Sequence, residues 1–69
     1  MKVFCIRLKE ARKAMGYSQK QVAELVDITA SAYANYEQGT REPSLSTLVK
    51  LVAVLDTTAD HLLGIEDWA

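Results

Sequence analysis

The sequence predicts an all-α fold of five short helices in a single domain spanning residues 1–69. Apolar residues recur at helical spacing, and no segment alternates with period two for long enough to form a strand. Serine or threonine precedes four of the helical segments, where a hydroxyl can cap the first turn. Glycine follows three of them, where a left-handed residue commonly ends a helix. No linker or internal repeat divides the chain, so one domain is expected.

The first helix is expected over residues 3–15. Phe4, Leu8, Ala11 and Met15 share one face at helical spacing. Gly16 then provides a left-handed stop.

A capping box predicts the start of the second helix, over about 18–26. Gln21 follows Ser18 by three residues, so each side chain can satisfy an amide that the helix leaves unpaired. Asp27 is expected to end this helix. Aspartate tolerates the left-handed conformation less well than glycine, although better than most residues, so a slightly strained elbow follows.

Thr29 opens the third helix, which covers about 30–37 and carries Tyr33 and Tyr36 as its apolar anchors. The two residues between the second helix and Thr29 leave room only for a steep crossing of the two helices. Residues 18–37 therefore have the layout of a helix-turn-helix, which pushes its second helix outward.

The rest of the chain predicts two further helices. After a turn that contains Pro43, Ser44 caps a fourth helix over about 45–55. Thr58 caps a last short helix that runs through Leu63 and ends at Gly64.

Composition indicates a soluble globular protein and excludes several classes. The chain is 49% hydrophobic and 25% charged, too apolar for disorder. It lacks a signal-peptide pattern and an apolar run long enough for a membrane span, so we expect a cytoplasmic protein with no membrane partner. One cysteine, Cys5, and one histidine, His61, give little support for a metal or redox role. We expect no cofactor, no metal and no small-molecule substrate.

The charge pattern bears on nucleic-acid binding. A net charge of −1 counts against affinity for DNA, which depends on neutralising phosphates. However, six of the eight basic residues lie within residues 1–20, whereas the last part of the chain is acidic. This uneven distribution lowers the expected affinity more than it argues against the function.

Nearly the whole chain resembles the phage repressor and Cro-type helix-turn-helix domains. The motifs that carry the resemblance are Arg7-Leu-Lys-Glu-Ala-Arg12, Gly16, Ser18-Gln19, Val22-Ala23-Glu24-Leu25, Tyr36-Glu37-Gln38-Gly39, Arg41-Glu42-Pro43-Ser44-Leu45, Leu48, Lys50-Leu51 and Leu62-Leu63-Gly64. No single motif is diagnostic, but their order is highly specific. The resemblance implies a five-helix lambda-repressor-like DNA-binding domain that places its third helix in the major groove of double-stranded DNA, usually as a dimer on a two-fold operator.

The sequence departs from this family at three places. Asp27 and Asp56 stand where such domains typically have glycine. In the third helix, the outward positions Ala30, Ser31 and Ala34 are short where the family often has glutamine, arginine or lysine. Sparse readout of bases is therefore expected.

The base-contact candidates are Asn35, Ser31 and Ala30. An amide such as Asn35 can bond an adenine edge in two places, a serine can bond a base or a phosphate, and an alanine can touch a thymine methyl. The alternative for Asn35 is an exposed polar residue that ends the helix. The alternative for Ala30 is a residue that only favours helix formation.

The phosphate-contact candidates flank the third helix. Gln19 lies in the first turn of the second helix, where its amide and the positive helix end favour a phosphate oxygen. The alternative is that Gln19 only serves the start of the helix. Thr40, Arg41 and the amides after Ser44 belong to the loop that lies along the DNA backbone in the family. Lys9, Lys13 and Lys20 either add long-range attraction or are simply solvated.

Other candidates have structural roles. The family pairs arginine and glutamate at the positions of Arg12 and Glu37, which implies an ion pair between the first and third helices. The fourth helix has more apolar surface than one core needs, so we expect a homodimer interface formed by Val49, Ala53, Leu62, Leu63, Ile65 and Trp68. Alternatively, the tail folds back on its own subunit.

Two functions fit these observations. The first is a sequence-specific DNA-binding transcriptional regulator, a repressor that acts as a homodimer on a short inverted repeat. The second is a protein-interaction module that keeps the fold with weak or no DNA binding, such as an antirepressor or a partner subunit. An enzyme is not expected, because no nucleophile with a base, carboxylate pair or phosphate loop can be assembled.

Overall fold

The computed structural model describes residues 2–65, which form five α-helices and no strand. The helices are α1 (Lys2–Met15), α2 (Gln19–Leu25), α3 (Ala30–Gln38), α4 (Leu45–Val54) and α5 (Ala59–Leu63). The predicted all-α, five-helix fold class is confirmed. Trp68 lies outside the described residues.

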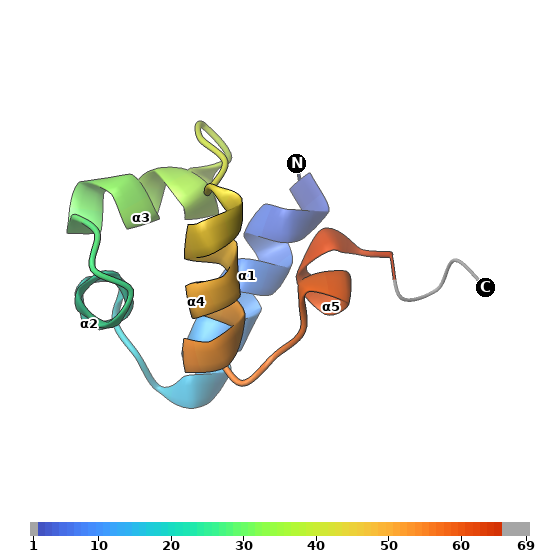
Figure 1. The fold of residues 1–69 in the computed structure, drawn as a ribbon, viewed down its shortest axis with the longest axis horizontal. Coiled ribbons are helices and arrows are strands. Elements are labelled where there is room, and N and C mark those ends of the chain that lie inside the picture. Colours follow the sequence, from blue (N-terminus) through green and yellow to red (C-terminus); the bar gives the residue numbers. More distant parts are fainter. Residues whose placement is uncertain (1, 66–69) are drawn as a thin grey trace.

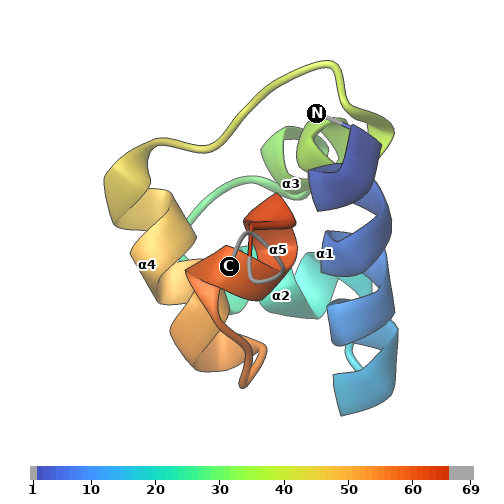
Figure 2. The ribbon, with the colours of Figure 1, turned by 90° about the vertical axis from the view of Figure 1, so that its right-hand side faces the viewer.

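The five helices pack around one core, each in contact with at least two others. In Figure 1, α2 is seen end-on below the start of α3, and α4 stands in front of α1. Helix α1 packs against α3 and α5, while α4 packs against α2 and α5. Figure 2 shows α5 between α1 and α4, at the end of the molecule away from the start of α3. Helix α3 therefore lies at one end of the domain, with its inner side on α1 and α2.

Four helices begin with the same chemical device. The hydroxyls of Ser18, Thr29, Ser44 and Thr58 accept hydrogen bonds from backbone amides three residues later, at 3.0–3.2 Å. The Ser18 backbone amide donates to Gln21 Oε1 at 2.8 Å, which completes the predicted capping box. These caps fix where each helix starts.

Left-handed residues end the helices. Gly16, Gly39 and Gly64 have positive φ, and so do Asp27 (φ 61°) and Asp56 (φ 52°). The Ile28 amide donates to the carbonyl of Ala23, and the Thr57 amide donates to the carbonyl of Val52, as in the Schellman motif. The two aspartates therefore adopt the left-handed conformation that glycine usually takes at a helix end, although their Cβ atoms make it less favourable. This was expected for Asp27.

The core is built from all five helices. Its fully buried residues include Leu8, Val22, Tyr33, Leu51 and Leu62. Leu62 has no exposed surface, so its assignment to a dimer interface is wrong for this conformation: its side chain fills the core of its own subunit.

Two apolar residues at helix ends are exposed, and one of them, Met15, belongs to the predicted apolar face of the first helix. Met15 is 41% exposed and Leu25 is 54% exposed, because each lies in the last turn of its helix and points away from the core. Leu25 lines an open pocket together with Tyr17, Gln21 and Glu24. None of the helices between residues 2 and 65 combines the length and apolar content that crossing a bilayer requires.

Candidate nucleic-acid interface

The outward side of α3 carries the predicted base-contact residues. Ala30 and Ser31 are exposed, and Asn35 is half-buried. On the opposite side Tyr33 and Tyr36 are buried and meet edge to face, with ring centroids 6.3 Å apart. The two tyrosines hold α3 on the core, while Ala30 and Ser31 on its outward side stay exposed and Ala34 and Asn35 are half-buried.

Gln38 belongs to the same outward side, and the sequence reasoning missed it. The helix runs to Gln38, one residue further than predicted, and this side chain is exposed. Its spacing of four and eight residues from Ala34 and Ala30 was the available signal. We call Ala30, Ser31, Ala34, Asn35 and Gln38 the α3 ridge.

A carboxylate at the end of α3 joins three parts of the domain. Arg12 Nε donates to Glu37 Oε2 at 2.7 Å, and Arg12 Nη2 donates to Glu37 Oε1 at 3.2 Å. Arg12 Nη1 also donates to the carbonyl of Tyr17 at 2.8 Å. The Tyr33 hydroxyl donates to Glu37 Oε2 at 2.6 Å. The network fixes α3 relative to α1 and to the loop before α2.

Gln19 completes this network. Its side-chain Nε2 donates to Glu37 Oε1 at 3.0 Å, so one of its two N–H bonds is turned inward. The amide keeps a second N–H and its oxygen for other partners. Because Gln19 is the first residue of α2 and is only half-buried, it stands at the edge of the α3 ridge with its orientation set by Glu37.

The network shifts the ionisation of its members. Burial alone would raise the pKa of Glu37, but hydrogen bonds from Arg12, Tyr33 and Gln19 outweigh it, so the pKa is lowered. The hydrogen bond with Glu37 raises the pKa of Arg12. Burial, reinforced by the bond to Glu37, raises the pKa of the Tyr33 hydroxyl. Glu37 and Arg12 are therefore both charged, and Tyr33 is neutral, at physiological pH.

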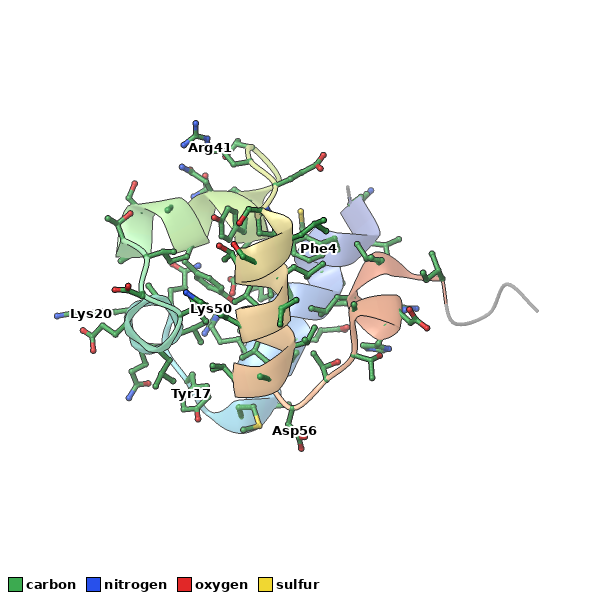
Figure 3. All side chains as sticks on the ribbon, viewed as in Figure 1. Phe4, Tyr17, Lys20, Arg41, Lys50 and Asp56 are labelled. Atoms are coloured by element: carbon green, nitrogen blue, oxygen red, sulfur yellow. The ribbon has the colours of Figure 1, made fainter. Side chains whose placement is uncertain are left out.

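The loop after α3 supplies the other flank. Thr40 and Arg41 are exposed, and the Thr40 hydroxyl donates to the carbonyl of Asn35 at 3.3 Å. Ser44 uses its hydroxyl as the cap of α4, so the groups that it leaves for an anion are the first backbone amides of that helix. Figure 3 shows Arg41 beyond α3 at one end of the molecule and Asp56 at the opposite end.

The basic side chains lie at several places around the domain. In Figure 3, Lys20 projects outward from α2, whereas Lys50 extends from α4. Lys9 and Lys13 are exposed on α1. Of the basic residues, Arg41 is the nearest in sequence to the α3 ridge. Separately, no cluster of described His, Cys, Asp and Glu residues is arranged to hold a metal ion.

Comparison with known proteins identifies the class to which this fold and surface belong. The family model described as Helix-turn-helix matches residues 8–62. The chain belongs to this family, in its phage repressor and Cro (XRE) type, as the sequence motifs predicted.

The relatives are named as regulators. The chain is 48% identical over 60 residues to the HTH-type transcriptional regulator AnsR of Bacillus subtilis, covering 87% of this chain and 52% of AnsR. It is 45% identical over 58 residues to ImmR of the same organism, covering 84% and 46% of the two chains. The cryptic phage CTXphi transcriptional repressor RstR of Vibrio cholerae is 36% identical over 58 residues, covering 84% and 52%.

The chain spans about half the length of these curated relatives. No solved structure matches it significantly. Over residues 8–62 the chain belongs to the helix-turn-helix family, and the relatives described above are named as transcriptional regulators or repressors.

Proposed function

We propose that this protein is a sequence-specific DNA-binding transcriptional regulator, a repressor that acts as a homodimer on a short inverted repeat in double-stranded DNA. The observation that carries the proposal is the α3 ridge, exposed at Ala30, Ser31 and Gln38, between Gln19 on one flank and Arg41 on the other. Membership of a family whose relatives are named transcriptional regulators supports it.

The mechanism follows from the two kinds of group on this surface. Phosphates on both sides of the major groove are held by Gln19 on one flank and by Thr40, Arg41 and the amides after Ser44 on the other. These contacts set the register of α3. Ala30, Ser31 and Asn35 then face base edges. Repression results from occupation of the promoter, which excludes other proteins from the same site.

The dimer is proposed on an apolar stripe of α4. Leu45 is 82% exposed and Val49 is 66% exposed, and Ala53 continues the stripe one turn further. Leu63 is half-buried and Ile65 is 40% exposed near the end of α5. A second copy would cover these side chains, and a two-fold axis there would present two α3 ridges to half-sites about 34 Å apart.

A binding assay with one charge reversal tests the proposal. A random duplex library is selected at low salt, and fluorescence anisotropy compares the selected duplex with scrambled DNA. We expect a clear preference for the selected duplex, and we expect Arg41→Glu to weaken binding of both duplexes strongly while light scattering shows an unchanged oligomeric state. Lys50→Glu is the matched control, because it alters net charge equally from an exposed position on α4. Equal binding of selected and scrambled DNA would refute the proposal.

A second function is a protein-interaction module with weak or no DNA binding. The net charge of −1 and the short side chains at Ala30, Ser31 and Ala34 favour it. Under this alternative, Arg41→Glu changes neither the DNA affinity measured by anisotropy nor the oligomeric state measured by light scattering.

A further inference from the structure

We propose that Gln38 is the main base-reading side chain of the α3 ridge and that it recognises the major-groove edge of an adenine. The inference deepens the proposed function and rests on it. It begins from the position of Gln38, which is exposed in the last residue of α3.

The helical geometry puts Gln38 near the middle of the ridge around the helix axis, while along the axis it is the last residue. At about 100° per residue, position 38 lies about 80° around α3 from position 30, between position 34 at about 40° and position 31 at about 100°. Asn35 lies at the margin, at about 140°, and is half-buried. The longer amide, Gln38, therefore projects in the central outward direction from the last residue of α3, and the shorter amide, Asn35, projects toward one side.

The short neighbours of Gln38 favour contact with bases. Ala30, Ser31 and Ala34 extend little beyond the backbone of α3, so this helix can approach the floor of a groove closely. The ridge is about 12 Å long at 1.5 Å per residue, which corresponds to three or four base pairs. A glutamine at its end can then reach a base that a helix with long side chains would hold out of range.

The chemistry of the amide selects the ligand. Glutamine donates an N–H and accepts at its oxygen, which matches N7 and the N6 amino group of adenine as a pair. Glu37 next to it is fully occupied by Arg12, Tyr33 and Gln19, so it does not compete for the Gln38 amide in the structure. The side chain of Gln38 is exposed, so in this proposal its role is to specify sequence and not to hold the fold.

The test uses the duplex that the wild-type protein selects and replaces each adenine in turn with 7-deazaadenine, which removes N7 and leaves base pairing intact. We expect one adenine in each half-site at which the replacement weakens wild-type binding about tenfold. The same replacement should have no effect on Gln38→Ala. Gln38→Lys should change the preferred base at that position to guanine. Glu10→Ala, an exposed substitution on α1, is the control and should behave as the wild type.

Two results would overturn the inference while the proposed function stands. In the first, Gln38→Ala keeps the wild-type preference at every position. In the second, it weakens selected and random DNA equally, as the loss of a phosphate contact does. Failure of the wild-type protein to select any sequence is a different result, which refutes the proposed function itself. Circular dichroism of both variants checks that α3 is intact.

Discussion

The carboxylate of Glu37 at the end of α3 accepts two hydrogen bonds from the guanidinium of Arg12 on α1, at 2.7 and 3.2 Å. Both side chains are nearly buried, with 3% and 11% of their surfaces exposed. The pair also binds the loop before α2 and the first side chain of α2. The position of α3 relative to α1 and to Gln19 therefore depends on one carboxylate.

Loss of Arg12 should destabilise the domain strongly. Arg12→Met leaves Glu37 charged without its cation, and we expect the free energy of unfolding to fall by about 3 kcal/mol. Urea titration followed by circular dichroism measures the change. Arg41→Met, at an exposed arginine, is the control and should have almost no effect on stability. A loss below about 1 kcal/mol for Arg12→Met would mean that the pair contributes little.

The stability of the fold should decrease in acid through Glu37. The pKa of this group is lower in the folded state than its ordinary value of 4.5. Its contribution is therefore fully present above pH 4.5 and is lost as the pH falls through the folded pKa. Glu37→Gln should be less stable at pH 7 but should lose less further stability in acid. Thermal melts from pH 7 down to pH 2 are the measurement, and parallel curves for the two proteins would contradict this assignment.

Replacing the left-handed aspartates with glycine should stabilise the domain. Asp27 and Asp56 have positive φ and also bring negative charge to the C-terminal ends of α2 and α4. We expect Asp56→Gly to raise the free energy of unfolding by about 0.5–1 kcal/mol, even though glycine is more flexible when unfolded. Differential scanning calorimetry should show a higher Tm. Asp60→Gly, inside α5, should instead lower it.

A charge on the α4 stripe should prevent self-association. Val49→Glu puts a carboxylate on a residue that is 66% exposed in the single subunit, so the subunit should remain folded. We expect a monomer by light scattering at concentrations where the wild type is a dimer. Ala14→Glu adds the same charge to an exposed site on α1 and should leave the dimer intact. A wild-type protein that is monomeric at every concentration would exclude this interface.

Arg41 should contribute an electrostatic, sequence-independent share of DNA affinity. We expect Arg41→Ala to weaken selected and scrambled DNA by similar factors and to reduce the slope of log affinity against log salt by about one per subunit. Anisotropy titrations at several salt concentrations measure this slope. An unchanged slope would place Arg41 away from the phosphates.

Local chemistry made most of the fold predictable. Hydroxyl caps at Ser18, Thr29, Ser44 and Thr58 act within a few residues, so the sequence alone indicates where helices begin. The five-helix class was predicted correctly for the same reason, whereas the family was predicted correctly from the order of its sequence motifs. The left-handed conformation of Asp27 also follows from its place between two helices.

Tertiary relationships were harder to predict. Helical spacing indicates that Leu62 is apolar and on one face, but not whether its partner is its own core or another subunit. The bonds that Glu37 receives from Tyr33 and Gln19 depend on how three helices cross. Gln38 was missed because it stands in a family motif beside Gly39, whereas its role depends on exposure.

The most direct measurement is NMR chemical-shift mapping of the labelled protein with the duplex that it selects. We expect the largest changes at the α3 ridge, at Gln19 and from Thr40 to Ser44, with small changes at Leu45, Val49 and Ala53 of α4 beyond those that dimerisation causes. Changes concentrated on α4 and α5, or no changes with any duplex, would contradict the assignment of α3 as the DNA-reading helix.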